Sequence, residues 1–307
     1  MIGMDETIYY DAEDLLVKHM KRYEISSEEI GFIEQCGIYE QYVERSVEEQ
    51  CMLLARICYY SPRLSMFMLH RLHSGHICRE LFDLDNSDFI SVGVLEPTYR
   101  VSGISTRVSE RMGCLYINGA KIFPYLGYSS RILIVGRLKK DTYVVAIGSS
   151  KTIDVRYTRY MRHLGMNLSY VNLNGFPLCE NPVFRYVKPN TILNIYRTLA
   201  LLIRAHICGL IDRIKDEATK YANRNYVGNL DVDIAKDVMG RKRICTGKNK
   251  RLGEDVARVI RLCVECFDID VVLRGSMINY YLYSLLESFA YYSAIMNQLT
   301  FFEGSNS

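Results

Sequence analysis

The period of the hydrophobic residues changes twice along this chain of 307 residues. Apolar side chains recur every three to four positions from residue 7 to about 87 and again from 191 to 301, as in amphipathic helices. Between them, short runs that alternate apolar and polar residues predict β-strands. We therefore predict an α+β protein of three domains: an N-terminal helical domain (residues 1–88), a central small β-sheet domain (89–188) and a C-terminal antiparallel helical bundle (189–307).

Polar residues and a proline mark the helix boundaries of the first domain. Asp11 is placed to cap a first helix, and Ser26 with Glu29 has the spacing of a capping box. The longest helical pattern, residues 48–77, contains Pro62, which lacks a backbone N–H and favours a break or a kink. Three or four helices are expected before the strands.

The strongest β signal lies at residues 90–123. Two alternating segments, 104–111 and 114–123, flank Met112-Gly113 and predict a β-hairpin. Further strands are expected at residues 132–135, 143–147, 152–157 and 170–173. A linker is then predicted by Pro177, Pro182 and Pro189. The helices expected after it cover about residues 191–224, 231–244, 252–267 and 276–301.

The composition argues against two classes of protein. The net charge is only +3, and the densest basic stretch, residues 241–251, lacks interleaved aromatic residues, so we predict a solvated loop there and no nucleic-acid partner. No apolar run approaches the ~18 residues of a membrane span. The first residues lack the basic-then-apolar layout of a signal peptide, so a cytoplasmic location is expected.

The spacing of the cysteine and histidine residues does not predict a metal site. The ten cysteines are scattered apart from Cys263 and Cys266, and a second pair that would complete a zinc site is missing. His70, His73 and His76 recur every three residues, which a helix would place on adjoining positions. With no acidic residues beside them in the sequence, a polar helix edge is the simpler interpretation, and we predict no metal.

Several short motifs, in this order and spacing, resemble those of the acyl-CoA dehydrogenase family. They are Leu95-Glu96-Pro97 with Asn118, Gly119 and Lys121 after it, His163-Leu164-Gly165-Met166, Tyr221-Ala-Asn-Arg224 continuing to Gly228, and Phe302-Glu303-Gly304-Ser305-Asn306. The resemblance covers almost the whole chain and implies the same helix–sheet–helix fold. It also implies a homodimer or homotetramer, with an electron-transfer flavoprotein as a further partner.

The resemblance implies an FAD-dependent oxidoreductase of fatty acid metabolism that introduces a double bond between the α and β carbons of an acyl-CoA thioester. In that case Glu303 would be the base that removes the α proton, and Arg224 would hold the phosphates of FAD. The other implied cofactor contacts are Leu95, Phe123, Tyr125 and Ser305. Two simpler interpretations remain: Glu303 as a solvated residue near the end of the sequence, and Arg224 as an arginine favoured at a helix C-terminus.

The residues expected around the flavin depart from the family pattern. Leu95 replaces a threonine, residues 98–101 replace a Gly-x-Gly-Ser, and Phe123-Pro124-Tyr125 replaces a Trp-x-Thr. These departures give an alternative from another class: a cofactor-free, non-catalytic structural or regulatory relative that partners an intact acyl-CoA dehydrogenase. A third alternative is a module that binds acyl-CoA without the redox step.

Overall fold

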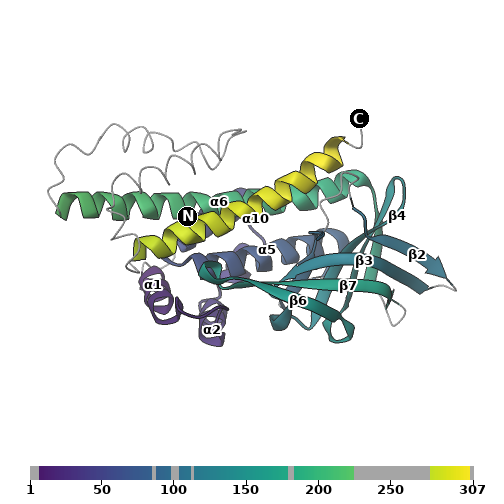
Figure 1. The fold of residues 1–307 in the computed structure, drawn as a ribbon, viewed down its shortest axis with the longest axis horizontal. Helices are drawn as coiled ribbons and strands as arrows, with labels where there is room; N and C mark the ends of the chain where they lie inside the picture. Colours follow the sequence, from purple (N-terminus) through teal and green to yellow (C-terminus); the bar gives the residue numbers. More distant parts are fainter. Residues whose placement is uncertain are drawn as a thin grey trace.

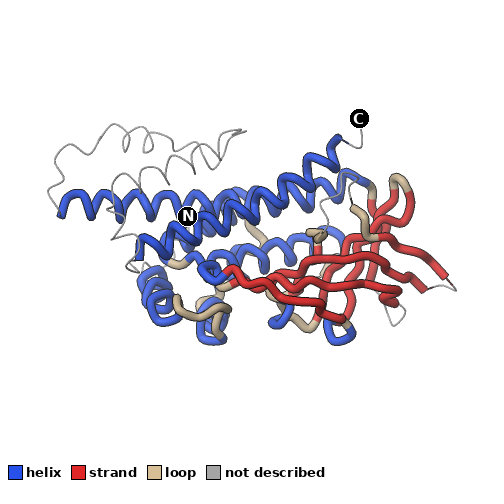
Figure 2. The backbone as a smooth tube through the Cα atoms, in the orientation of Figure 1, coloured by secondary structure: helices blue, strands red, loops and turns tan. Residues whose placement is uncertain are grey.

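A computed structural model describes residues 7–84, 88–97, 104–111, 114–178, 183–224 and 277–304. Helices pack along one side of a β-sheet, and two long helices lie across the top of the molecule in the view of Figure 1. Figure 2 shows the same separation of helices from strands by colour. The predicted order of helices, sheet and helices is confirmed. Among the described helices, none is both long and apolar enough to cross a membrane.

Five helices precede the sheet among the described residues. They are α1 (Thr7–His19), α2 (Ser27–Gln35), α3 (Ile38–Tyr42), α4 (Val47–Tyr60) and α5 (Pro62–Phe82). Serine side chains cap the start of three of them, α2, α4 and α5. The capping box is confirmed, since Ser26 accepts from the Glu29 N–H and the Glu29 side chain accepts from the Ser26 N–H. Pro62 is the first residue of α5, so the predicted break is also confirmed. The cap at Asp11 is wrong, because α1 starts four residues earlier and Asp11 lies exposed within it.

The strands form one mixed sheet. They are β1 (Ile90–Gly93), β2 (Arg107–Arg111), β3 (Cys114–Pro124), β4 (Arg131–Lys139), β5 (Thr142–Ser149), β6 (Asp154–Met161), β7 (Met166–Leu178) and β8 (Val183–Val187). Their order is β6-β7-β3-β2-β4-β5-β8, and β1 pairs in parallel with β4. The predicted hairpin is β2–β3, with Arg107 opposite Asn118 and Arg111 opposite Cys114.

The linker predicted from three prolines is wrong in part. Pro177 lies within β7 and Pro189 begins α6, while β8 pairs antiparallel with β5 between them. β8 is an edge strand with mostly exposed side chains, so its sequence carries no hydrophobic alternation to mark it.

Two long helices complete the described chain: α6 (Pro189–Arg224) and α10 (Met277–Gly304). Both confirm predicted helices, whereas those expected at residues 231–244 and 252–267 lie outside the described residues. α6 and α10 lie side by side (Figure 1). The Tyr196 hydroxyl on α6 lies 2.6 Å from the Val94 carbonyl oxygen and 3.1 Å from Gln298 Oε1. One side chain thus joins the start of α6, the segment after β1 and the last part of α10.

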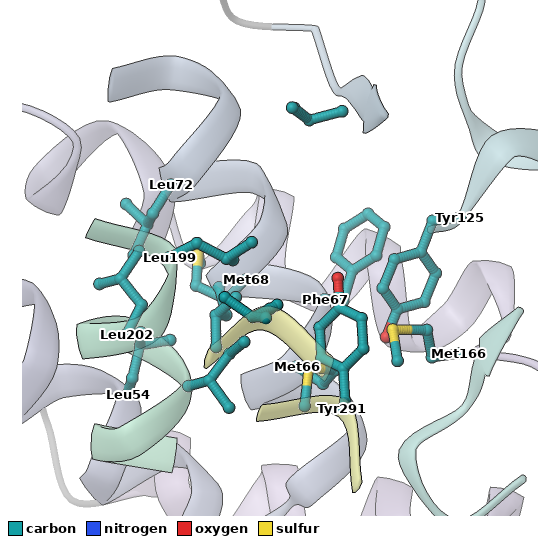
Figure 3. Packing of buried hydrophobic residues seen from close by; sticks show 14 of the residues in the cluster. Leu54, Met66, Phe67, Met68, Leu72, Tyr125, Met166, Leu199, Leu202 and Tyr291 are labelled. Atoms are coloured by element: carbon teal, nitrogen blue, oxygen red, sulfur yellow. The ribbon is translucent and has the colours of Figure 1, made fainter. Parts of the chain in front are cut away.

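The buried apolar residues form two cores on opposite faces of the sheet. The first lies between the helices and the sheet and includes Leu54, Phe67, Leu199 and Leu202 (Figure 3). The second lies on the other face and includes Ile117, Ile134 and Leu173. Because successive residues of a strand point to opposite faces, neighbouring residues of one strand enter different cores.

Candidate functional site

The Leu95-Glu96-Pro97 motif is anchored by a buried ion pair. Lys121 Nζ lies 2.8 Å from Glu96 Oε1 and donates to it, and both side chains are buried. The backbone N–H groups of Ser105 (2.7 Å) and Thr106 (3.0 Å) also donate to this carboxylate. Burial alone would raise the pKa of Glu96, but the Lys121 charge and these hydrogen bonds outweigh it and lower that pKa to about 2. Glu96 is therefore an ionised structural residue that ties the segment before β2 to β3.

Leu95 does not face an open site. Its side chain belongs to the core between the helices and the sheet, and its carbonyl oxygen accepts from the Ile122 N–H at 2.9 Å. These two residues also form an isolated β-bridge. Leu95 was expected to contact a flavin ring, but its side chain is packed in the core and its carbonyl group already accepts a hydrogen bond.

Phe123 and Tyr125 enter different cores. Phe123 lies in the second core, and a Cβ atom placed on Gly93 would come within 2.5 Å of its ring. Gly93 therefore lets the Phe123 ring pack flat against strand β1. Tyr125 follows the end of β3 in the left-handed region, at φ 54°, and turns toward the helices instead. Two side chains on opposite faces of the sheet cannot line one side of a planar ring.

Tyr125 is enclosed by residues of its own chain. Its ring centroid lies 5.2 Å from that of Phe67 and 5.7 Å from that of His70, both in edge-on contacts. Figure 3 shows Tyr125 beside Phe67 and Met166 in the core. Its hydroxyl donates to the Leu164 carbonyl at 3.3 Å, and burial raises the pKa of this hydroxyl far above its usual value. The hydroxyl, which is the one polar group of this side chain, therefore already has a hydrogen-bond partner within the chain.

These three positions do not fit an isoalloxazine ring. Phe123 and Tyr125 are each 0% exposed and Leu95 is 5% exposed, so almost none of their surface meets solvent. The Tyr125 N–H, which would be a free donor at an open site, donates to the Asn167 carbonyl at 3.0 Å. A ring placed here would have to displace packed side chains and break these hydrogen bonds.

The remaining predicted site residues are placed only through their helices. Arg224 ends α6 and Glu303 lies in the last turn of α10, but their side chains, like all of Ser305, lie outside what the structure describes. The Tyr196–Gln298 contact brings the end of α10, with Glu303, toward the segment that carries Leu95. Arg224 is separated from Tyr196 by about 42 Å of helix, so among the described positions this chain does not bring Arg224 to Leu95.

The three spaced histidines are mainly structural. His70 and His73 are buried, and burial lowers their pKa values to about 3 and about 4. His73 Nε2 donates to the Ile195 carbonyl at 3.0 Å. His76 is half-buried and lies 3.6 Å from Glu80. In the described ranges, no group of three or more His, Cys, Asp or Glu residues is arranged to hold a metal ion.

One buried polar cluster was not predicted from the sequence. His206 on α6 lies 3.0 Å from Ser65 Oγ on α5 and 3.0 Å from Ser288 Oγ on α10. Burial lowers the His206 pKa to about 3, so the imidazole is neutral. The two serines lie 141 and 82 residues away along the chain, and no local pattern connects them to this histidine. The cluster joins three helices through hydrogen bonds.

Comparison with known proteins finds similarity to solved structures at the level of the fold. No family model and no curated protein sequence matches it. Butyryl-CoA dehydrogenase from Megasphaera elsdenii is similar over 99% of both chains, with 11% identity and a TM-score of 0.67. The ChsE4–ChsE5 complex from Mycobacterium tuberculosis aligns over 96% of this chain and 94% of its own, with 12% identity and a TM-score of 0.71.

A third structure connects this fold with flavin. XiaF from Streptomyces, solved with FADH2 and glycerol, is similar over 98% of this chain and 84% of its own, with 10% identity and a TM-score of 0.58. Proteins of this fold thus include a butyryl-CoA dehydrogenase and a protein with bound FADH2. The predicted resemblance is confirmed for the fold.

Proposed function

We propose that this chain is a cofactor-free relative of the acyl-CoA dehydrogenases, with a structural or regulatory role. The observation that carries the proposal is the packing of Leu95, Phe123 and Tyr125, which have almost no surface left for a flavin ring. Their polar groups add support, because the Leu95 carbonyl and the Tyr125 N–H and hydroxyl all have partners within the chain. Losing these contacts would cost about 0.5–1.5 kcal/mol each before any flavin contact formed.

The proposed role is that of a subunit beside an intact dehydrogenase of the same fold. A precedent for two different chains in one assembly is the ChsE4–ChsE5 complex, whose fold is similar. The partner would then supply the flavin and the redox step.

A second candidate is the FAD-dependent α,β-dehydrogenation of an acyl-CoA thioester. One observation favours it: the Tyr196 hydroxyl contacts both Val94, next to Leu95, and Gln298, five residues before Glu303 in α10. In this candidate Glu303 is the base, and the Glu303→Gln variant abolishes turnover with an artificial electron acceptor while flavin stays bound. Retained turnover in that variant would exclude Glu303 as the base.

The visible spectrum distinguishes the two candidates. The protein is purified, incubated with excess FAD, desalted and scanned, with butyryl-CoA dehydrogenase treated in the same way as the positive control. We expect a colourless protein, and flavin only in the dehydrogenase that co-purifies with it. A stoichiometric flavin spectrum from this chain alone would reject the cofactor-free role and favour the second candidate.

A further inference from the structure

We propose that the β6 edge of the sheet, together with the segment between α1 and α2, binds single-stranded nucleic acid. β6 is the last strand on its side of the sheet, and nearly all of its side chains are exposed. Its sequence contains the two residue types that such binding uses, in Arg156-Tyr157 and Arg159-Tyr160, and Arg162 follows directly after the strand. Arginines hold phosphates, and tyrosines provide flat faces for bases.

The basic side chains here have no acidic partners in the described part of the chain. Arg156 and Arg159 are exposed and form no ion pair with any described residue. Arg162 lies over the Tyr23 ring, at 5.1 Å from its centroid, which brings the end of β6 beside Arg22. This arrangement leaves a positive surface available to phosphate groups.

Two of the carboxylates near this surface have partners within the chain, and Asp154 at the start of β6 is exposed. Glu28 lies 2.6 Å from Lys18 Nζ and 2.9 Å from His19 Nε2. Glu24 accepts a hydrogen bond from the Asn167 side-chain amide at 2.8 Å. The charge of Glu28 is thus offset by Lys18, whereas Glu24 accepts from a neutral amide and keeps its charge.

The tyrosines provide fixed aromatic faces. Tyr157 stacks on Tyr170 with ring centroids 4.1 Å apart and planes 15° apart, yet it is 55% exposed. Its outer face is therefore held in place and open. Tyr160 is 47% exposed and packs edge-on against Tyr23 at 6.0 Å. Three residues of strand, or about 10 Å, separate the two exposed tyrosines, and strand alternation turns them to opposite faces of the sheet, so a bound single strand would have to cross the β6 edge to contact both.

A hollow beside Tyr160 is large enough for a nucleobase. Its volume is about 600 Å³, and its walls include Arg22, Tyr23, Glu24, Tyr128 and Tyr160. The hollow joins the β6 surface at Tyr160 and Tyr23. A base stacked on tyrosine in the hollow would leave its phosphate near the arginines of the rim.

The charge pattern argues against a second copy of this chain as the occupant. Antiparallel pairing of β6 with itself about its centre would place Arg156 opposite Arg159, and like charges directly opposite each other are destabilising. The occupant should therefore be negatively charged. We expected no nucleic-acid partner because the basic stretch at residues 241–251 has no aromatic residues between its basic ones. In β6, tyrosines do lie between the arginines.

The test is fluorescence anisotropy of a labelled single-stranded oligonucleotide of mixed sequence, as DNA and as RNA, with the full-length protein. We expect at least one of the two oligonucleotides to bind. If four phosphates are neutralised, the logarithm of the association constant should fall with the logarithm of the salt concentration at a slope of about −3. Tyr160→Ala should weaken binding about tenfold through lost stacking, and R156Q/R159Q should weaken binding and reduce the salt slope. The matched control is R185Q/Y186A on the opposite edge strand, β8, which should bind like the unchanged protein.

Several outcomes would overturn the proposal. They are no binding of either oligonucleotide at low salt, an equal loss in the β8 control, and binding of polyglutamate or duplex DNA as tight as that of the single strand. Binding of coenzyme A without binding of an oligonucleotide would also overturn it, because the hollow would then serve a single nucleotide. All the substituted side chains are exposed, so circular dichroism should show unchanged folding.

Discussion

Lys121 Nζ lies 2.8 Å from Glu96 Oε1 in the interior of the β domain, where neither group meets solvent. The two residues belong to the motifs that relate this chain to the acyl-CoA dehydrogenases, yet their contact is with each other. The pair fixes the segment before β2 against β3, and it keeps Leu95 in the core. What the motif preserves here is the local fold of the β domain.

Removing one member of this pair should destabilise the protein strongly. Lys121→Met leaves the Glu96 carboxylate buried without its counter-charge, which typically costs about 3–5 kcal/mol. Urea unfolding would measure this loss. The double variant E96Q/K121M removes both charges and should recover much of the stability, and a double variant as unstable as Lys121→Met would contradict the account.

Removing the Tyr125 ring should lower the free energy of unfolding as much as removing any large aromatic side chain from a protein core. Tyr125→Ala leaves a cavity between Phe67 and the sheet, and we expect a loss of about 3–5 kcal/mol, as for other large aromatic residues. Exposed Tyr157→Ala is the matched control and should change the unfolding free energy little. A loss below about 1 kcal/mol for Tyr125→Ala would indicate a loosely filled site at this position.

The crossing of α4 and α6 depends on Gly209. A Cβ atom at this position would lie 2.1 Å from the Ala55 carbonyl oxygen, so Gly209→Ala must move one helix backbone. We expect destabilisation of at least the ~1–3 kcal/mol that overpacking costs. Gly31→Ala in α2 is the control, because nothing lies within 4 Å of its added Cβ. Thermal unfolding should show Gly31→Ala equal to or more stable than the original protein, by up to about 1 kcal/mol.

The buried histidine His206 makes stability depend on pH. Its pKa is lowered to about 3 in the folded protein, so between pH 6.5 and 3 the unfolded chain binds a proton there that the folded chain does not. Stability therefore falls as pH is lowered through this window, with a contribution of up to about 1.4 kcal/mol per pH unit. Urea titrations at several pH values should show a shallower slope for His206→Gln. Equal slopes in the two proteins would contradict the assignment.

Local signals in the sequence predicted the fold well where a single stretch decides the structure. The Ser26 capping box, the break at Pro62 and the β2–β3 hairpin depend on residues a few positions apart, and all three are confirmed. Asp11 failed as a cap because its helix begins at Thr7, and an exposed acidic residue is equally suited to a helix interior. β8 was missed because an exposed edge strand has no apolar face.

The site could be predicted only in part, because the core in which a side chain packs depends on residues far away in the sequence. Phe123 and Tyr125 are two positions apart, so strand alternation alone would put them on one face. The positive φ of Tyr125 reverses that expectation by turning the chain after β3 ends. Likewise, the role of His206 depends on serines from two other helices. Glu303 and Arg224 as functional residues remain predictions.

The central claim is that the residues expected to contact a flavin ring are packed as core. The most direct test is thermal unfolding of the purified protein with and without excess FAD. A flavin bound at 100 times its Kd would add about 2.7 kcal/mol to the stability of the folded state, or roughly 5 °C or more in Tm. We expect the same Tm with and without FAD. A rise of that size, saturating with FAD concentration, would contradict it.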